Sequence, residues 1–211
     1  MRISTTTIEA FRLFRDPDQE WMTEDELVAT IRGEFVPNAK TILGHAFDAV
    51  LNEPDQHRVE GGYQAGPHFF PDLMMAPALA LFDRRGVFQV KSTKQYLEGE
   101  VVAVADELVG LQLIENKTTT GSFDFEKYAH SCQWRFMVDI FQPAVVTYRV
   151  FLLSDPEQGA ISLRSIETFN LFPYPELTYD CARLVRDFAA YVRRKGLDGL
   201  LREKQRLAAA G

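Results

Sequence analysis

The chain has 211 residues, of which 46% are hydrophobic and 25% charged, and these fractions are close to those of ordinary globular proteins. They exclude an intrinsically disordered or collagen-like chain, and the length predicts one domain of ordinary size. The 23 Lys and Arg residues against 30 Asp and Glu residues give a net charge of −7. This balance argues against a protein that coats nucleic acid by bulk charge, while leaving a local basic groove open.

Cysteine content and the lack of long apolar runs indicate a protein of the cytoplasm. Two cysteines, Cys132 and Cys181, exclude a disulfide scaffold and a four-thiolate metal cluster, and a reducing compartment is the simpler setting. No basic-then-apolar signal segment opens the sequence, and the longest apolar run is well short of the ~18 residues of a membrane span. We therefore expect a soluble protein with no membrane partner.

Helices are predicted in the first part of the chain. Thr23 followed by Glu26 is the pattern of a capping box that opens a helix through Ile31. A second helix is expected from Asn38 to residue 52, because its apolar residues recur at helical spacing. Residues 69–82 are apolar but contain two prolines, which predicts a broken or short helix under a loop.

Strands follow in the middle of the chain. The segments 86–90, 100–107 and 111–118 are rich in β-branched residues, and the last two are separated only by a short break around Gly110, which predicts a tight hairpin. The remaining elements are expected to be one long amphipathic helix over 125–141, two strands over 145–153 and 161–171, a helix over 175–195 that ends at Gly196, and a short helix up to residue 210.

This order of elements predicts the α/β class, with a mixed central β-sheet flanked by α-helices. No linker divides the sequence, so we expect residues 1–211 to form one domain, with a core over about 38–170 and C-terminal helices over 175–210.

Charged residues at the end of the predicted hairpin indicate chemistry. Strand periodicity places Glu115 and Lys117 on the same face as Leu113, and Asp106 ends the preceding strand. Two carboxylates that converge with a lysine are what metal-assisted phosphodiester cleavage requires, because hard oxygen ligands suit Mg²⁺ or Mn²⁺. The alternative is an ordinary salt bridge at a sheet edge.

The hairpin resembles the signature of the PD-(D/E)XK nuclease superfamily, in which an acidic residue ends one strand and (D/E)-x-K ends the next. Asp106, Glu115 and Lys117 match these positions. The hydroxyl-rich residues after the lysine, the stretch Leu-Gly-His-Ala-Phe-Asp around His45, and Gln133 on a downstream helix are similar to the RecB-like branch. The sequence departs from that branch at Met137, where the branch usually has a tyrosine, and lacks the cysteines of its iron–sulfur members.

The resemblance implies a restriction-endonuclease-like core and a set of site residues. His45, Asp106, Glu115 and the main-chain carbonyl of Asn116 would be the metal ligands, Lys117 the catalytic lysine, and Gln133 the residue that orients the phosphate or the lysine. For His45 the alternative is a capped or partly buried helix residue, and for Gln133 a solvated polar residue.

By resemblance, the function is a Mg²⁺-dependent or Mn²⁺-dependent deoxyribonuclease in phage or bacterial recombination and repair. The relatives favour an exonuclease, but whether the protein attacks DNA at its ends or internally stays open. The alternative is a catalytically inactive nucleic-acid-binding or assembly protein of the same fold. Strand preference, polarity, a homo-oligomer and a recombination partner protein remain open.

DNA would be the partner of the nuclease and of the inactive alternative alike. Basic residues in three regions are candidates for a DNA-binding groove. For the C-terminal ones, the alternative is a solvated helix face. The candidates are Lys91, Lys94, Lys127, Arg135, Arg183, Arg186, Arg193, Arg194, Lys195, Arg202, Lys204 and Arg206.

Overall fold

The computed structural model describes residues 1–16, 22–82 and 86–201 of the chain. Its centre is a six-stranded mixed sheet in the order β1-β6-β7-β8-β9, with β5 paired to β6 outside this path. The strands are β1 (Arg2–Ser4), β5 (Val87–Gln95), β6 (Glu100–Val109), β7 (Gln112–Thr119), β8 (Val145–Leu153) and β9 (Leu163–Leu171). A separate three-stranded antiparallel sheet consists of β2 (Arg58–Val59), β3 (Gly62–Ala65) and β4 (His68–Pro71).

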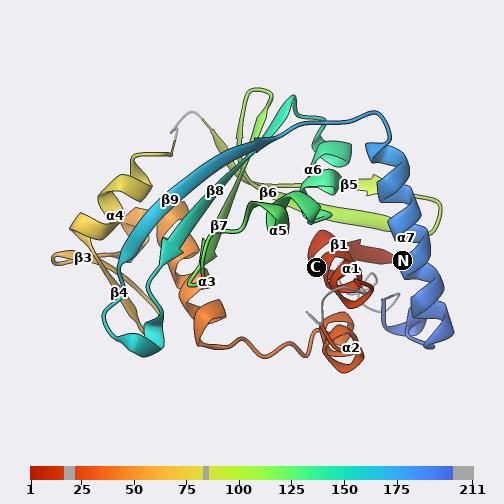
Figure 1. Ribbon diagram of the computed structural model, residues 1–211, viewed down its shortest axis with the longest axis horizontal. Helices are drawn as coiled ribbons and strands as arrows, with labels where there is room; N and C mark the ends of the chain where they lie inside the picture. The colour runs from red at the N-terminus through yellow and green to blue at the C-terminus, as the bar shows by residue number, and fades with distance from the viewer. Residues whose placement is uncertain (17–21, 83–85, 202–211) are drawn as a thin grey trace.

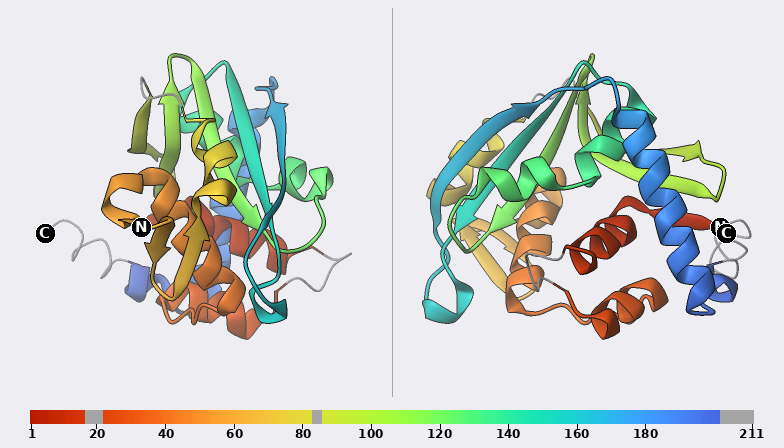
Figure 2. Two further views of the ribbon diagram at one scale, coloured as in Figure 1. Left: turned by 90° about the vertical axis from the view of Figure 1, so that its left-hand side faces the viewer. Right: turned by 45° about the vertical axis from the view of Figure 1, so that its right-hand side comes forward.

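Seven helices of the described residues surround the sheet. They are α1 (Thr5–Phe14), α2 (Glu24–Arg32), α3 (Ala39–Asn52), α4 (Asp72–Leu79), α5 (Phe125–His130), α6 (Gln133–Phe141) and α7 (Leu177–Arg194). Figure 1 shows α7 along one side of the molecule, and α4 with the small sheet on the other. In the right-hand view of Figure 2 the long strands curve over α1 and α7. None of these helices combines the length and apolar character that a bilayer crossing requires.

Alternation along β8 divides the hydrophobic core in two. Tyr148 and Val150 belong to a cluster with residues of α1, α2, α6 and α7, whereas Phe151 and Leu153 belong to a cluster with residues of α3, α4 and the small sheet. Successive strand residues point to opposite faces, so β8 is covered on both sides. This explains why its sequence reads as a nearly continuous apolar run.

Several predicted elements are confirmed. Thr23 and Glu26 form the expected capping box of α2, and the Asn38 side chain caps α3. The expected tight hairpin is formed by β6 and β7. Its turn has two residues, since Val109 pairs with Gln112, and Gly110 adopts a φ of 58°. The helix expected over 175–195 is α7, and Gly196 ends it in the left-handed conformation, with a φ of 67°.

Other predictions were wrong or incomplete. Residues 125–141 form two helices, because the chain is extended at Ser131. The segment 69–82 begins as strand β4 and continues as the short helix α4. The sequence analysis missed β1, α1 and the small sheet, whose strands are only two to four residues long. Most of the short helix expected up to residue 210 lies outside the described residues.

A buried carboxylate joins β5, α6 and α7. Asp139, whose side chain is 2% exposed, accepts hydrogen bonds from Lys94 at 2.7 Å, the Tyr96 hydroxyl at 2.5 Å and Thr178 at 2.6 Å. Burial on its own raises the pKa of Asp139, but these donors bring it below its ordinary value. Asp139 therefore contributes stability only while it is ionised.

Replacing Asp139 with Asn is expected to lower the free energy of unfolding by about 2–3 kcal/mol at pH 7, because an amide cannot accept from all three donors. Since the folded-state pKa is lowered, this contribution is complete above the ordinary pKa near 4 and is lost as the pH falls through the folded-state value. Urea denaturation should show the difference between the two proteins shrinking from pH 6 to pH 3. Asp55→Asn, at an exposed position, should differ from the wild type by less than about 0.5 kcal/mol throughout.

Candidate functional site

The candidate site lies where one edge of β6 changes neighbours. Residues 100–102 of β6 pair with β1 and residues 107–109 pair with β7. Between them, residues 103–106 pair with neither strand, so β1 and β7 move apart along this edge of β6. We call the gap between β1 and β7 at residues 103–106 the fork. A cavity of about 650 Å³ fills this fork, lined by residues of β1, α1, α3, β6 and β7, together with Gln89, Gln133 and two residues of β8.

Asp106 closes the inner end of the fork. Its Oδ2 accepts a hydrogen bond of 2.8 Å from the main-chain N–H of Asn116, in place of a ladder bond between β6 and β7. Its Oδ1 accepts from the side chain of Gln89 at 3.3 Å. Gln89 has a φ of 50°, which non-glycine residues seldom adopt, and it is skipped in the pairing of β5 with β6. Both oxygens of Asp106 are thus oriented by neighbouring strands.

Glu115 is buried beside Asp106, and only one of its oxygens is bound. Its Oε1 accepts hydrogen bonds from Lys117 at 2.6 Å and from Gln133 at 2.9 Å. Its Oε2 is buried and has no hydrogen-bond partner among the described residues. A buried carboxylate oxygen without a donor is costly, so this atom is where a cation or a proton would be most favourable.

The described residues that line the cavity supply three carboxyl groups, from Asp48, Asp106 and Glu115, and two amino groups, from Lys40 and Lys117. Burial raises the pKa of Glu115 to about 8, even though the neighbouring Lys117 opposes the shift. Burial and the nearby charge of Asp106 raise the pKa of Asp48 to about 6. Burial on its own lowers the pKa of Lys117, but the surrounding carboxylates raise it above its ordinary value. Lys117 is therefore charged, and Glu115, with a pKa of about 8, keeps its proton at neutral pH in the absence of another cation.

The structure brings most of the predicted site residues together. Asp106, Glu115, Lys117 and Gln133 line one cavity. Glu115 accepts hydrogen bonds from Lys117 and Gln133, and Asp106 accepts one from the main-chain N–H of Asn116. Asn116 contributes its main-chain N–H, and both polar atoms of its buried side chain lack a partner among the described residues. The role of each residue stays a prediction, because no ligand contact tests it.

His45 reaches the same cavity from the opposite wall. Its side chain is exposed on α3, and Gly44 lets this helix approach β7 so closely that a Cβ at Gly44 would lie 2.7 Å from Thr118 Oγ1. In the part of the chain that the structure describes, however, no three His, Cys, Asp or Glu side chains are grouped so that they could hold a metal ion. In this structure His45 therefore does not share a metal-binding group with Asp106 and Glu115.

Two residues of the site were missed by the sequence analysis. Asp48 lies one turn after His45, so helical spacing alone could have placed it on the same wall. Gln89 had no such signal, because its place opposite Asp106 depends on the register of β5 with β6, which the sequence does not show.

The predicted basic groove is not at this cavity. None of the described basic candidates lines it. Four of those residues form ion pairs elsewhere, Lys94 with Asp139, Arg183 with Asp180, Arg186 with Asp187 and Lys195 with Glu24. The candidates at 202, 204 and 206 lie outside the described residues. The cation that does line the cavity besides Lys117 is Lys40, which pairs with Asp155 at 2.9 Å.

Comparison with known proteins gives a likeness of fold. No protein-family model matches the chain, and no curated protein matches it significantly. Among solved structures, LHK-Exo in complex with dAMP is 15% identical, with a TM-score of 0.51, over 97% of this chain and 94% of that one. A candidate exonuclease from Eubacterium rectale is 10% identical, with a TM-score of 0.53, over 93% of this chain and 82% of that one.

At these identities the likeness shows the fold alone. The chain shares with the two exonuclease structures a mixed α/β architecture, and its central mixed sheet is flanked by helices, so the expected fold class is confirmed.

Proposed function

We propose that the protein is a metal-dependent deoxyribonuclease of the PD-(D/E)XK type, related to the RecB-like and phage exonucleases, that hydrolyses phosphodiester bonds of DNA. The observation that carries this proposal is the convergence of Asp106, Glu115, Lys117 and Gln133 in the fork of the sheet, with Oε2 of Glu115 buried and unpartnered. The fold shared with two exonuclease structures, one of them a complex with dAMP, supports it.

The donor set fits a hard divalent cation. Carboxylate and carbonyl oxygens are the ligands that Mg²⁺ and Mn²⁺ prefer. The unpartnered oxygen of Glu115 belongs to a cavity that Asp106 and Asp48 also line. Asp106, Glu115 and the main-chain carbonyl of Asn116 would hold the cation, and His45 would have to move toward the carboxylates to serve as a nitrogen ligand from α3. When bound, such a cation polarises the scissile phosphate and offsets the charge that develops on it.

The protein's own residues supply the remaining functions. Lys117 is charged, and its ammonium is held at 2.6 Å from Glu115, where it would orient the attacking water and stabilise the phosphate oxygens. Gln133 holds the same oxygen of Glu115 at 2.9 Å and thereby leaves Oε2 free. The roles in recombination or repair rest on the resemblance of the motifs and remain part of the proposal.

The purified protein is expected to degrade DNA with Mg²⁺ or Mn²⁺ and to be inactive in EDTA. Lys117→Ala should lower the cleavage rate at least about a hundredfold, since a charged group aimed at the transition state is removed. Arg32→Ala, which changes an exposed arginine of α2 outside the cavity, should retain the wild-type rate. Assays on linear and circular DNA, single- and double-stranded, would identify an exonuclease if circles are spared. Cleavage that persists in EDTA or in Lys117→Ala would contradict the proposal, and DNA binding without cleavage would favour the inactive module.

A second measurement separates a cation site from an ordinary salt bridge. The folded-state pKa of Glu115 is about 8, above its ordinary value of 4.5, so ionisation opposes folding and stability should fall as the pH rises between these values. Glu115→Gln removes that charge and keeps an acceptor for Lys117 and Gln133. In EDTA at pH 8–9 we expect it to raise the free energy of unfolding by on the order of 1–2 kcal/mol.

At pH 5, where Glu115 is protonated, urea denaturation should find the two proteins equally stable. Excess Mg²⁺ at pH 8 should stabilise the wild type and not the variant. If Glu115→Gln is less stable than the wild type at pH 8 in EDTA, the pair with Lys117 is a stabilising salt bridge and the charge argument for a cation fails.

A further inference from the structure

The junction between α5 and α6 determines where Gln133 lies. A continuous helix would carry the chain straight through residues 131–132, but Ser131 has φ −57° and ψ 140°, and α6 starts afresh at Gln133. The residue that precedes α6, Cys132, makes no side-chain cap. The first N–H groups of the new helix must therefore be satisfied by other residues.

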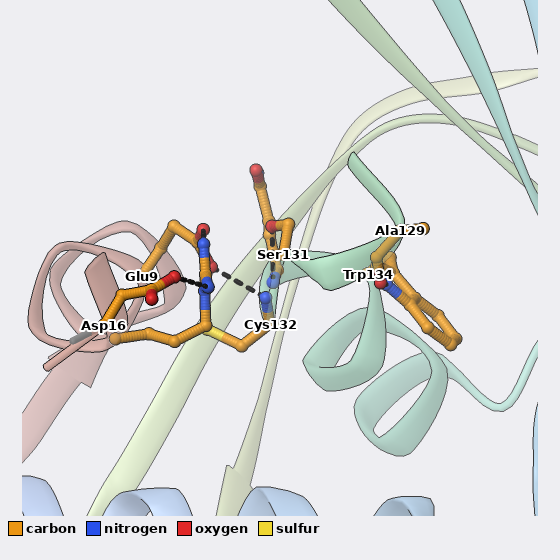
Figure 3. A network of polar contacts seen from close by, with 8 residues as sticks. Glu9, Asp16, Ala129, Ser131, Cys132 and Trp134 are labelled. Atoms are coloured by element: carbon orange, nitrogen blue, oxygen red, sulfur yellow. Dashed lines mark hydrogen bonds and ion pairs between the residues drawn. The ribbon is translucent and has the colours of Figure 1, made fainter. Parts of the chain in front are cut away.

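Glu9, more than 120 positions earlier in the chain, supplies that cap from α1. Its Oε2 accepts a hydrogen bond of 2.7 Å from the Cys132 N–H, and Ser131 Oγ accepts one of 3.1 Å from the Gln133 N–H. Figure 3 shows the Glu9 carboxylate facing the main chain at Cys132. A carboxylate at a helix N-terminus is favourable because the N–H groups there carry partial positive charge.

The Glu9 carboxylate is itself fixed in position. Arg12 donates two hydrogen bonds to its Oε1, at 2.8 Å and 3.1 Å, and also lies 3.9 Å from Asp16. Burial on its own raises the pKa of Glu9, but Arg12 and the Cys132 N–H bring it below its ordinary value. The cap is therefore ionised at neutral pH, and its two oxygens have separate partners.

Gln133 connects this cap to the cavity. It is the first residue of α6, and its side-chain Nε2 donates to Oε1 of Glu115 at 2.9 Å, the oxygen that Lys117 also contacts. A shift of the start of α6 would move Gln133 and free Glu115 to rotate, so that a different oxygen meets Lys117.

We propose that Glu9 is a positioning residue of the site: by capping α6 from α1, it holds Gln133 on Oε1 of Glu115 and keeps Oε2 free for a cation. The catalytic consequence rests on the proposed nuclease function, whereas the positioning of Gln133 does not. The Glu9 carboxylate does not touch the cavity residues Glu115 and Lys117. It acts on them through the main chain at Cys132 and then through the side chain of Gln133.

The test compares Glu9→Ala and Glu9→Gln with Thr23→Ala, which removes the cap of α2, a helix that contributes no residue to the cavity. The first readout is the NMR signal of the Gln133 side-chain amide, assigned with Gln133→Ala, together with hydrogen exchange of the amides of 132–136. The second is the affinity for Mn²⁺ alone, and the third is kcat and KM on DNA.

For Glu9→Ala we expect a shifted Gln133 signal, faster exchange at 132–136, an Mn²⁺ affinity about tenfold weaker, and a lower kcat with little change in KM. Glu9→Gln retains an acceptor for the Cys132 N–H but loses the charge, so it should show smaller changes of the same kind. If Glu9→Ala does not fold, the inference is tested with Glu9→Gln alone. Thr23→Ala should match the wild type in all three readouts.

A wild-type Gln133 signal and Mn²⁺ affinity in both Glu9 variants would overturn the inference. If the wild type neither binds Mn²⁺ nor cleaves DNA, the proposed function fails. The Gln133 signal and the exchange rates then decide by themselves whether Glu9 positions α6.

Discussion

Strand β6 has two different neighbours along one edge, and the site depends on the four residues between them. A strand edge left unpaired inside a protein exposes main-chain N–H and C=O groups that need other partners. Here Asp106 supplies one of these partners, because its carboxylate accepts the Asn116 N–H where a ladder bond would otherwise lie. The divergence of β1 and β7 creates the cavity, and the residue that stabilises the divergence also belongs to the site.

Burying ionisable groups in the fork lowers the free energy of unfolding. Glu115 is almost fully buried, and the ammonium of Lys117 faces three carboxyl groups, those of Glu115, Asp106 and Asp48. An apolar residue at position 115 would avoid this loss. A chain that keeps the carboxylate, with one oxygen unpartnered, gives up folding stability at a place where a ligand can restore it.

Elements from both layers of helices converge on this one edge of the sheet. On one wall Gly44 allows α3 to approach β7, which places His45 and Asp48 in the cavity. On the other wall α6 begins at the residue that contacts Glu115, and Glu9 of α1 holds that beginning. The helices therefore do more than cover the hydrophobic faces of the sheet, since two of them set the positions of polar groups within it.

The sequence by itself determined the elements whose signals are local. The caps at Thr23 and Asn38, the tight hairpin around Gly110 and the alternation along its strands could all be read within a few residues. Capping, turn conformation and strand periodicity depend on near neighbours. The same periodicity correctly placed Glu115 and Lys117 on one face, and their contact follows from that spacing.

Only the tertiary structure decided the features that join distant parts of the chain. The break before Gln133 is capped by Glu9, and Gln89 reaches Asp106 through an irregular strand pairing. A helix pattern over 125–141 satisfies every local rule, so no spacing within it reveals a carboxylate that arrives from 123 residues away. Hydrogen bonds depend on positions in space, and the local preferences of a sequence do not specify which distant groups will meet.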